Sequence, residues 1–146
     1  MPKTLGAEGE ERACNWMLAR GWRVLERNFR RRGGEIDIVA MDGATLVMAE
    51  VKTRSRIHEK FGGGEQAVNS KKRRRIIKTT HKWMRAHSFF GQKRYDIIEW
   101  TVSEGRWRLR WVPGAFRQWH QSDDWRYYDD RFQYNDASGR FEFRDE

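Results

Sequence analysis

The sequence predicts an α/β domain in which helices flank a mixed β-sheet. Three observations support this: a helical pattern near the start, three strand patterns after it, and a second long helical pattern before two further strands. The expected elements, in chain order, are a helix over 4–20, strands over 22–29, 35–41 and 45–53, a helix over about 65–85, and strands over 94–102 and 107–112. This order, α-β-β-β-α-β-β, makes residues 1–113 one domain and leaves 114–146 as a C-terminal extension of unknown role.

The first helix is indicated by its ends and by its apolar side. Thr4 can cap the first turn and Gly21 follows the last turn, while early acidic residues suit the positive end of the helix dipole. The side chains expected to face the core are Ala13, Cys14 and Met17. Glu10 precedes them at helical spacing, so it is expected on the same side. Two explanations stay open for this carboxylate: a metal-binding patch, or a solvated position favoured by the dipole.

The second and third expected strands form a hairpin, because Asp42-Gly43 between them is a strong turn signal. Under a two-residue turn, the opposed pairs are Glu35 with Glu50 and Asp37 with Met48. A four-residue loop preserves these pairs, whereas a bulge would shift them. Because side chains alternate along a strand, one face then carries Glu35, Asp37, Glu50 and Lys52.

This carboxylate patch lies within two nearly continuous apolar runs, the pattern of a sheet that is covered on both faces. Neighbouring carboxylates beside such a core repel each other unless a proton or a cation compensates them. A divalent metal ion would do so, and ligands made only of oxygen suit Mg²⁺ or Mn²⁺. The hairpin therefore predicts a metal site.

The charge distribution predicts a polyanionic partner. The formal net charge is +9, and it is concentrated before residue 114, while the extension after it is acidic and rich in aromatic residues. Nucleic acid is the favoured partner, because phosphate contacts release counterions. A membrane is disfavoured, since the sequence has no apolar stretch approaching ~18 residues. The start of the chain lacks the pattern of a secretory signal, so a cytoplasmic location is expected.

Basic residues that could contact phosphates occur on the second helix and around the hairpin. The expected contacts are Arg30, Arg31, Arg32, Arg54, Lys71, Arg75, Lys78 and Lys82. The four on the helix recur at a spacing that forms one stripe, while Ile76, Thr80 and Trp83 or Met84 turn inward. A solvated face is the alternative for such a stripe. Contacts of this kind read the shape of a nucleic acid rather than its base sequence.

Several short motifs occur in a fixed order along the chain. They are Gly6-x-x-Gly9-Glu10-x-x-Ala13, Gly21-Trp22, Arg27-Asn28-Phe29, Gly34-Glu35-Ile36-Asp37, Glu50-Val51-Lys52-Thr53-Arg54 and Phe61-Gly62. Together they resemble the YraN-like family of bacterial proteins over roughly residues 3–112. That family is similar to the archaeal Holliday-junction resolvases of the PD-(D/E)xK nuclease superfamily. The resemblance implies a restriction-endonuclease-like fold.

The resemblance also implies roles for individual residues. Asp37, Glu50 and Glu10, with the carbonyl of Val51, would hold Mg²⁺ or Mn²⁺, and Lys52 would orient the attacking water. Glu35 would either assist the metal or accept a bond from a backbone amide. The implied activity is that of a Mg²⁺-dependent endodeoxyribonuclease acting on structured or branched DNA in preference to RNA, and the resemblance to junction resolvases also suggests a homodimer.

Two nonenzymatic readings remain beside the nuclease. One is a catalytically inactive nucleic-acid-binding module on a nuclease fold, and the other is an assembly factor associated with structured RNA. For the extension, a hairpin, docking on the body and disorder all remain open, because its aromatic stretches alternate like strands among acidic residues.

Overall fold

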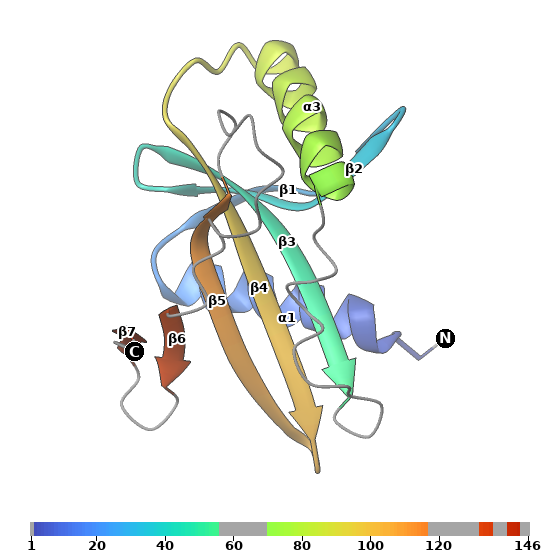
Figure 1. Cartoon of the computed structure of the whole chain (residues 1–146), viewed down its shortest axis with the longest axis vertical. Coiled ribbons are helices and arrows are strands. Elements are labelled where there is room, and N and C mark those ends of the chain that lie inside the picture. Colours follow the sequence, from blue (N-terminus) through green and yellow to red (C-terminus); the bar gives the residue numbers. More distant parts are fainter. Residues whose placement is uncertain (1, 56–69, 117–131, 136–139, 144–146) are drawn as a thin grey trace.

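The computed structural model describes residues 2–55, 70–116, 132–135 and 140–143 (Figure 1). Its elements, in chain order, are α1 (Leu5–Ala19), β1 (Arg23–Arg31), β2 (Gly34–Asp42), β3 (Thr45–Ser55), α3 (Ser70–Ala86), β4 (Lys93–Ser103), β5 (Arg106–Phe116), β6 (Phe132–Asn135) and β7 (Arg140–Phe143). The predicted α/β class and the order α-β-β-β-α-β-β are confirmed. The Phe61-Gly62 motif and the first residues of the second expected helix lie outside the described residues.

The main sheet is mixed, with the strand order β1-β2-β3-β4-β5. Strands β3 and β4 are parallel, whereas the other neighbours are antiparallel. A parallel pair needs a crossover connection, and α3 lies within the segment that joins these two strands. Figure 1 shows α3 on one face of the sheet near the β1–β2 hairpin and α1 on the other face.

Two apolar clusters fill the two sides of the sheet. The α3 side contains Val39, Met41, Leu46, Met48, Ile76 and Trp83, among others. The α1 side contains Ala13, Cys14, Met17, Ile38, Ala40, Val47 and Ala49, among others. Residues 46–49 of β3 alternate between the clusters, which explains why this part of the strand is continuously apolar.

Helix α1 has the predicted cap and the predicted core face. The Oγ1 atom of Thr4 accepts the Ala7 N–H at 3.1 Å, and Gly21 follows the helix with a φ of 83°. Ala13, Cys14 and Met17 are buried as expected. The buried residues of the helix lie from Gly9 onward, and the helix packs against the sheet next to β3.

Helix α3 is fixed to the β1–β2 hairpin by polar as well as apolar contacts. The indole N–H of Trp83 donates to Oε2 of Glu26 at 2.8 Å, and Nζ of Lys82 donates to the carbonyl of Arg32 at 3.0 Å. Gly34 permits the close approach, because a Cβ there would lie 2.1 Å from the hydroxyl oxygen of Thr79. The helix and the hairpin therefore form one unit.

The last strand of the sheet continues beyond Pro113. Ala115 and Phe116 are buried, and Phe116 stacks on Tyr95. A buried carboxylate fixes this part of β5: Asp96 accepts the indole N–H of Trp111 and the backbone N–H of Gly114, each at 3.0 Å. Farther along the extension, β6 and β7 pair as a small antiparallel sheet that contacts β5. None of the described helices is long and apolar enough to cross a membrane.

Candidate active site

The register of the β2–β3 hairpin differs from the prediction by two residues. Its pairs run from Asp42 with Thr45 to Ile38 with Ala49, so Val39 and not Asp37 lies opposite Met48. The expected pairing of Glu35 with Glu50 was therefore wrong. The reason is the turn, which is formed by residues 43–44, so that Asp42 stays in the strand. There, Oδ2 of Asp42 accepts a hydrogen bond of 3.0 Å from the guanidinium group of Arg94.

The shifted register brings Asp37 level with Glu50. Beyond the Ile38–Ala49 pair, the Oδ2 atom of Asp37 accepts the backbone N–H of Val51 at 2.8 Å, so a side chain takes the place of a backbone acceptor. The carboxyl groups of Asp37 and Glu50 lie within hydrogen-bonding reach of each other. The two predicted metal ligands of the hairpin are thus neighbours.

Burial and charge repulsion dominate the electrostatics of Asp37. Desolvation, followed by the negative charge of Glu50, raises the pKa of Asp37 to about 8, although the Val51 N–H acts in the opposite direction. This carboxyl group therefore holds its proton more strongly than a free aspartic acid does, and a divalent cation bound beside it would oppose that effect. Two adjacent oxygen ligands that need positive charge fit a hard divalent ion such as Mg²⁺ or Mn²⁺.

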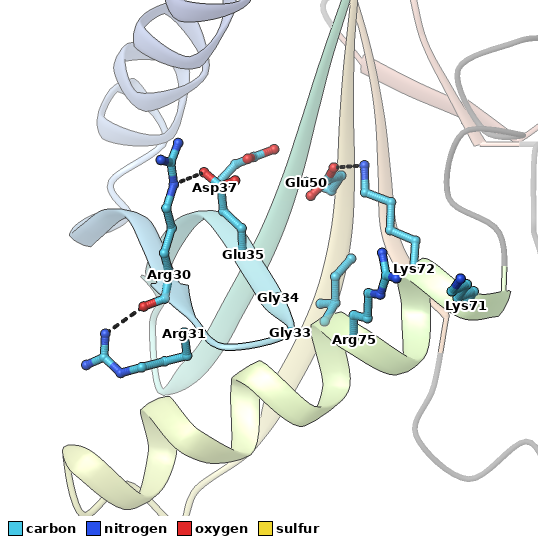
Figure 2. A pocket seen from close by; sticks show the side chains of 11 residues that line it. Arg30, Arg31, Gly33, Gly34, Glu35, Asp37, Glu50, Lys71, Lys72 and Arg75 are labelled. Atoms are coloured by element: carbon cyan, nitrogen blue, oxygen red, sulfur yellow. Dashed lines mark hydrogen bonds and ion pairs between the residues drawn. The ribbon is translucent and has the colours of Figure 1, made fainter.

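Glu50 is buried and forms an ion pair with Nζ of Lys72, from the first turn of α3 (Figure 2). Lys72 was not among the predicted site residues, because the basic stripe of this helix was assigned to Lys71 and Arg75. A signal was present: Lys72 precedes Ile76 by one helical turn and Trp83 by three, so it belongs to the inward face. Lys72 thus lies at the N-terminal end of the side of α3 that carries Ile76 and Trp83.

Glu10 approaches the site from α1. The helix lies so close to β3 at this point that a Cβ on Gly9 would lie 1.8 Å from Oγ1 of Thr53. Burial raises the pKa of Glu10, a hydrogen bond from Asn28 and the charge of Arg27 lower it, and Glu35 and Glu50 raise it further. Glu10 is therefore electrostatically coupled to the hairpin carboxylates. Nevertheless, no three His, Cys, Asp or Glu side chains among the described residues are grouped closely enough to hold a metal ion.

The other residues expected in the site have distinct surroundings. Lys52 shares the α3-side face of β3 with Glu50 by strand alternation and is half-buried. Val51 contributes its N–H to Asp37, as described above. Glu35 forms a 3.0 Å ion pair with Nε of Arg30, so in this structure it pairs with a cation on the neighbouring strand.

A cleft of about 890 Å³ opens above the carboxylates (Figure 2). Its lining residues are Arg30, Arg31, Gly33, Gly34, Glu35, Asp37, Glu50, Lys71, Lys72, Arg75 and Ile76. Figure 2 shows Arg30 and Lys72 reaching toward the acidic side chains from opposite sides. The cleft thus has an acidic floor and two basic walls, one from the β1–β2 hairpin and one from α3.

Four of the predicted phosphate contacts line this cleft, namely Arg30, Arg31, Lys71 and Arg75. Four others, Arg32, Arg54, Lys78 and Lys82, are described by the structure but are not among the lining residues. Lys82 instead donates to the backbone of Arg32 and so holds α3 against the hairpin. Lys52 is likewise outside the lining.

The fold and the site define an α/β protein whose mixed sheet carries a buried and a half-buried carboxyl group, Glu50 and Asp37, beneath a basic cleft. Residues 9–100 match the Uncharacterised protein family UPF0102. The chain belongs to this family, which is the YraN-like group that its motifs indicated.

Relatives in three bacteria illustrate the extent of the similarity. A UPF0102 protein of Geobacter metallireducens is 42% identical over 115 residues, which cover 78% of this chain and 93% of that protein. One from Anaeromyxobacter dehalogenans is 40% identical over 115 residues, covering 78% and 84% of the two chains. One from Persephonella marina is 45% identical over 94 residues, covering 64% and 79%.

Proposed function

We propose that this protein is a metal-dependent endonuclease that hydrolyses phosphodiester bonds in structured or branched DNA. The observation that carries the proposal is the pairing of Asp37 with Glu50 at the floor of a cleft whose walls are basic. A carboxylate pair attracts a divalent cation and a basic wall attracts a phosphate, so the cleft can collect both participants of phosphodiester hydrolysis in one place.

Asp37 and Glu50 would hold Mg²⁺ or Mn²⁺, with Glu10 and the Val51 carbonyl as the further ligands implied by the family resemblance. When bound, the metal ion supplies Lewis-acid activation of the phosphate and lowers the pKa of a water molecule. Lys52, two residues after Glu50 on the same face of β3, would orient the attacking water and stabilise the negative charge that develops on the phosphate.

The walls of the cleft support a preference for backbone shape over base sequence. Arg30 and Arg31 come from one wall, and Lys71 and Arg75 from the other. These side chains are suited to phosphate oxygens on two sides of a bent or branched backbone. A cytoplasmic location, a preference for DNA over RNA and a homodimeric state belong to the same proposal.

A second function, that of a nucleic-acid-binding module without catalysis, is favoured by one observation. Lys72 already neutralises Glu50, so the site has an internal cation in the place where a nuclease needs a metal ion. In this alternative the ion pair is permanent, and the basic walls bind structured DNA or RNA without hydrolysis.

A cleavage assay distinguishes the two functions. Labelled four-way junction, flap, single-stranded and duplex DNA, with a matched structured RNA, would be incubated with the protein in Mg²⁺, Mn²⁺ or EDTA. Cleavage that requires metal and falls at least 100-fold in Asp37→Asn and in Lys52→Ala supports the nuclease. Lys78→Ala is the control for loss of a charge outside the cleft. Binding without cleavage, unchanged in Asp37→Asn, would instead support the binding module.

A further inference from the structure

We propose that Lys72 is an exchangeable internal counter-cation, which leaves Glu50 when a divalent metal ion binds and then contacts a nucleic-acid phosphate in the cleft. The binding of metal and the binding of phosphate are then coupled through one lysine. This inference rests on the proposed function for the chemical identity of the two ligands.

The ion pair between Lys72 and Glu50 is asymmetric in its burial. The Lys72 side chain is 39% exposed, whereas the Glu50 side chain is 10% exposed. The carboxylate cannot be left without a positive partner at this depth, because an unpaired buried charge is costly. The lysine can move its ammonium group into water at little cost. Glu50 therefore requires a cation, but not this particular cation.

The charge of the site favours a divalent ion over the lysine. Lys72 supplies one positive charge to a site that contains two carboxyl groups, those of Asp37 and Glu50. A divalent ion supplies two positive charges to the same pair. Its binding at Glu50 also repels the ammonium group that is already there, so the lysine must move as the metal enters.

A phosphate in the cleft would offer the displaced lysine a new partner. Lys72 lines the same cleft as Lys71 and Arg75 on its own helix, and Arg30 and Arg31 face them from the hairpin. A phosphate held between these walls would accept a hydrogen bond from the ammonium group of Lys72 and form an ion pair with it. Because phosphate draws Lys72 away from Glu50 and metal expels it, each ligand strengthens the binding of the other.

Binding of Mn²⁺ alone, followed by the paramagnetic resonance signal of the free ion, tests the first half of this inference. Lys72→Ala is expected to bind Mn²⁺ about tenfold more tightly than the wild-type protein, because one like charge beside the ion is removed. Lys72→Arg, which restores the charge, should return toward the wild-type affinity. Lys71→Ala, a charge loss in the same wall, should change it less than about twofold.

Two outcomes of the Mn²⁺ experiment would overturn the inference. One is an affinity in Lys72→Ala that equals or falls below that of the wild type. The other is an absence of Mn²⁺ binding in every variant, which would overturn the proposed nuclease as well. Thermal unfolding in EDTA gives a second readout: Lys72→Ala should lose stability that Mn²⁺ restores, because Glu50 loses its cation in that variant and regains one with the metal.

The coupling itself is measured with DNA that remains intact. In a Lys52→Ala background, the affinity for a four-way DNA junction would be measured in EDTA and in Mn²⁺ by fluorescence anisotropy. The ratio of the two affinities should be at least about threefold larger with Lys72 than with Lys72→Ala, while Lys71→Ala keeps the larger ratio. Equal ratios in all variants would contradict the coupling. A protein that shows the coupling but cleaves no DNA would refute the nuclease and leave this inference standing.

Discussion

Asp37 accepts the backbone N–H of Val51 through its Oδ2 atom at 2.8 Å. The same carboxyl group therefore accepts a hydrogen bond from the backbone of β3 and also lies beside Glu50 in the cleft. Changes at this one position are expected to separate the two roles, because some substitutions keep the hydrogen bond and others remove it.

Asp37→Asn should make the metal-free protein more stable at pH 8 and abolish the Mn²⁺ binding that the proposed function requires. The amide oxygen can still accept the Val51 N–H, while the buried negative charge disappears. Relief of that charge is expected to contribute on the order of 1–2 kcal/mol. Asp37→Ala leaves the N–H without its partner and should cost about 1–3 kcal/mol. Urea unfolding in EDTA measures both; a less stable Asp37→Asn protein would contradict the account.

The stability of the metal-free protein should fall as pH rises from about 4 to about 8. The pKa of Asp37 is raised from 3.8 to about 8 in the folded protein, so between these values the folded state holds a proton that the unfolded state has lost. This contribution is complete below the unfolded pKa and is lost as pH passes through the folded one. The difference in unfolding free energy between wild type and Asp37→Asn isolates it. Saturating Mn²⁺ should reduce the pH dependence, and an identical profile for both proteins would refute the assignment.

Gly9→Ala should be strongly unfavourable although Gly9 lies in a helix, where alanine is normally preferred. Its Cβ would lie 1.8 Å from Oγ1 of Thr53, so α1 must move from β3, and Glu10 moves with it. A loss of about 1–3 kcal/mol is expected. Gly6→Ala is the matched control, since a Cβ there meets nothing within 4 Å, and it should gain up to about 1 kcal/mol. Thermal unfolding of the two variants, with Gly9→Ala/Thr53→Ala as a partial rescue, tests this; equal effects would contradict it.

Asp96→Ala should cost about 3–5 kcal/mol, because it leaves the half-buried Arg94 without its closest carboxylate. Asp96 accepts two bonds from that guanidinium and further bonds from Trp111 and Gly114. Asp42→Ala removes one 3.0 Å contact of Arg94 at the more exposed end of the network and should cost much less. Chemical denaturation ranks the two; a larger loss in Asp42→Ala would show that the turn, rather than the β4–β5 pairing, depends on this network.

The predictable part of the fold was the part encoded locally. Apolar runs, the Thr4 cap and the Asp-Gly turn signal were sufficient for the α/β class and for a hairpin that brings Asp37 near Glu50, although the turn itself lies one residue later than predicted. The register was not local. Asp-Gly is a good turn by itself, but Arg94 on β4 pairs with Asp42 and keeps it in the strand, and nothing near the hairpin reveals that partner.

In the site, too, the locally encoded features could be predicted and those that depend on distant residues could not. The hairpin carboxylates could be predicted from their alternation, whereas the partner of Glu50 came from a helix more than 20 residues later. The phase of α3 would have indicated Lys72, since it shares the inward side with Ile76, but a run of five cations hides which one points inward. The link from Asp96 to Gly114 depends on β4–β5 pairing and had no local signal.

The bonds from Lys82 and Trp83 to the β1–β2 hairpin have a consequence for how a substrate enters. These bonds and the core packing of Ile76 and Trp83 join the two basic walls of the cleft, so neither wall can move outward without breaking contacts. Under the proposed function, a polyanion would meet a slot whose width is set by these contacts, and the polyanion itself would supply the flexibility. Strands that bend or part easily, as at a branch point or a free end, should therefore enter more readily than a stiff continuous helix.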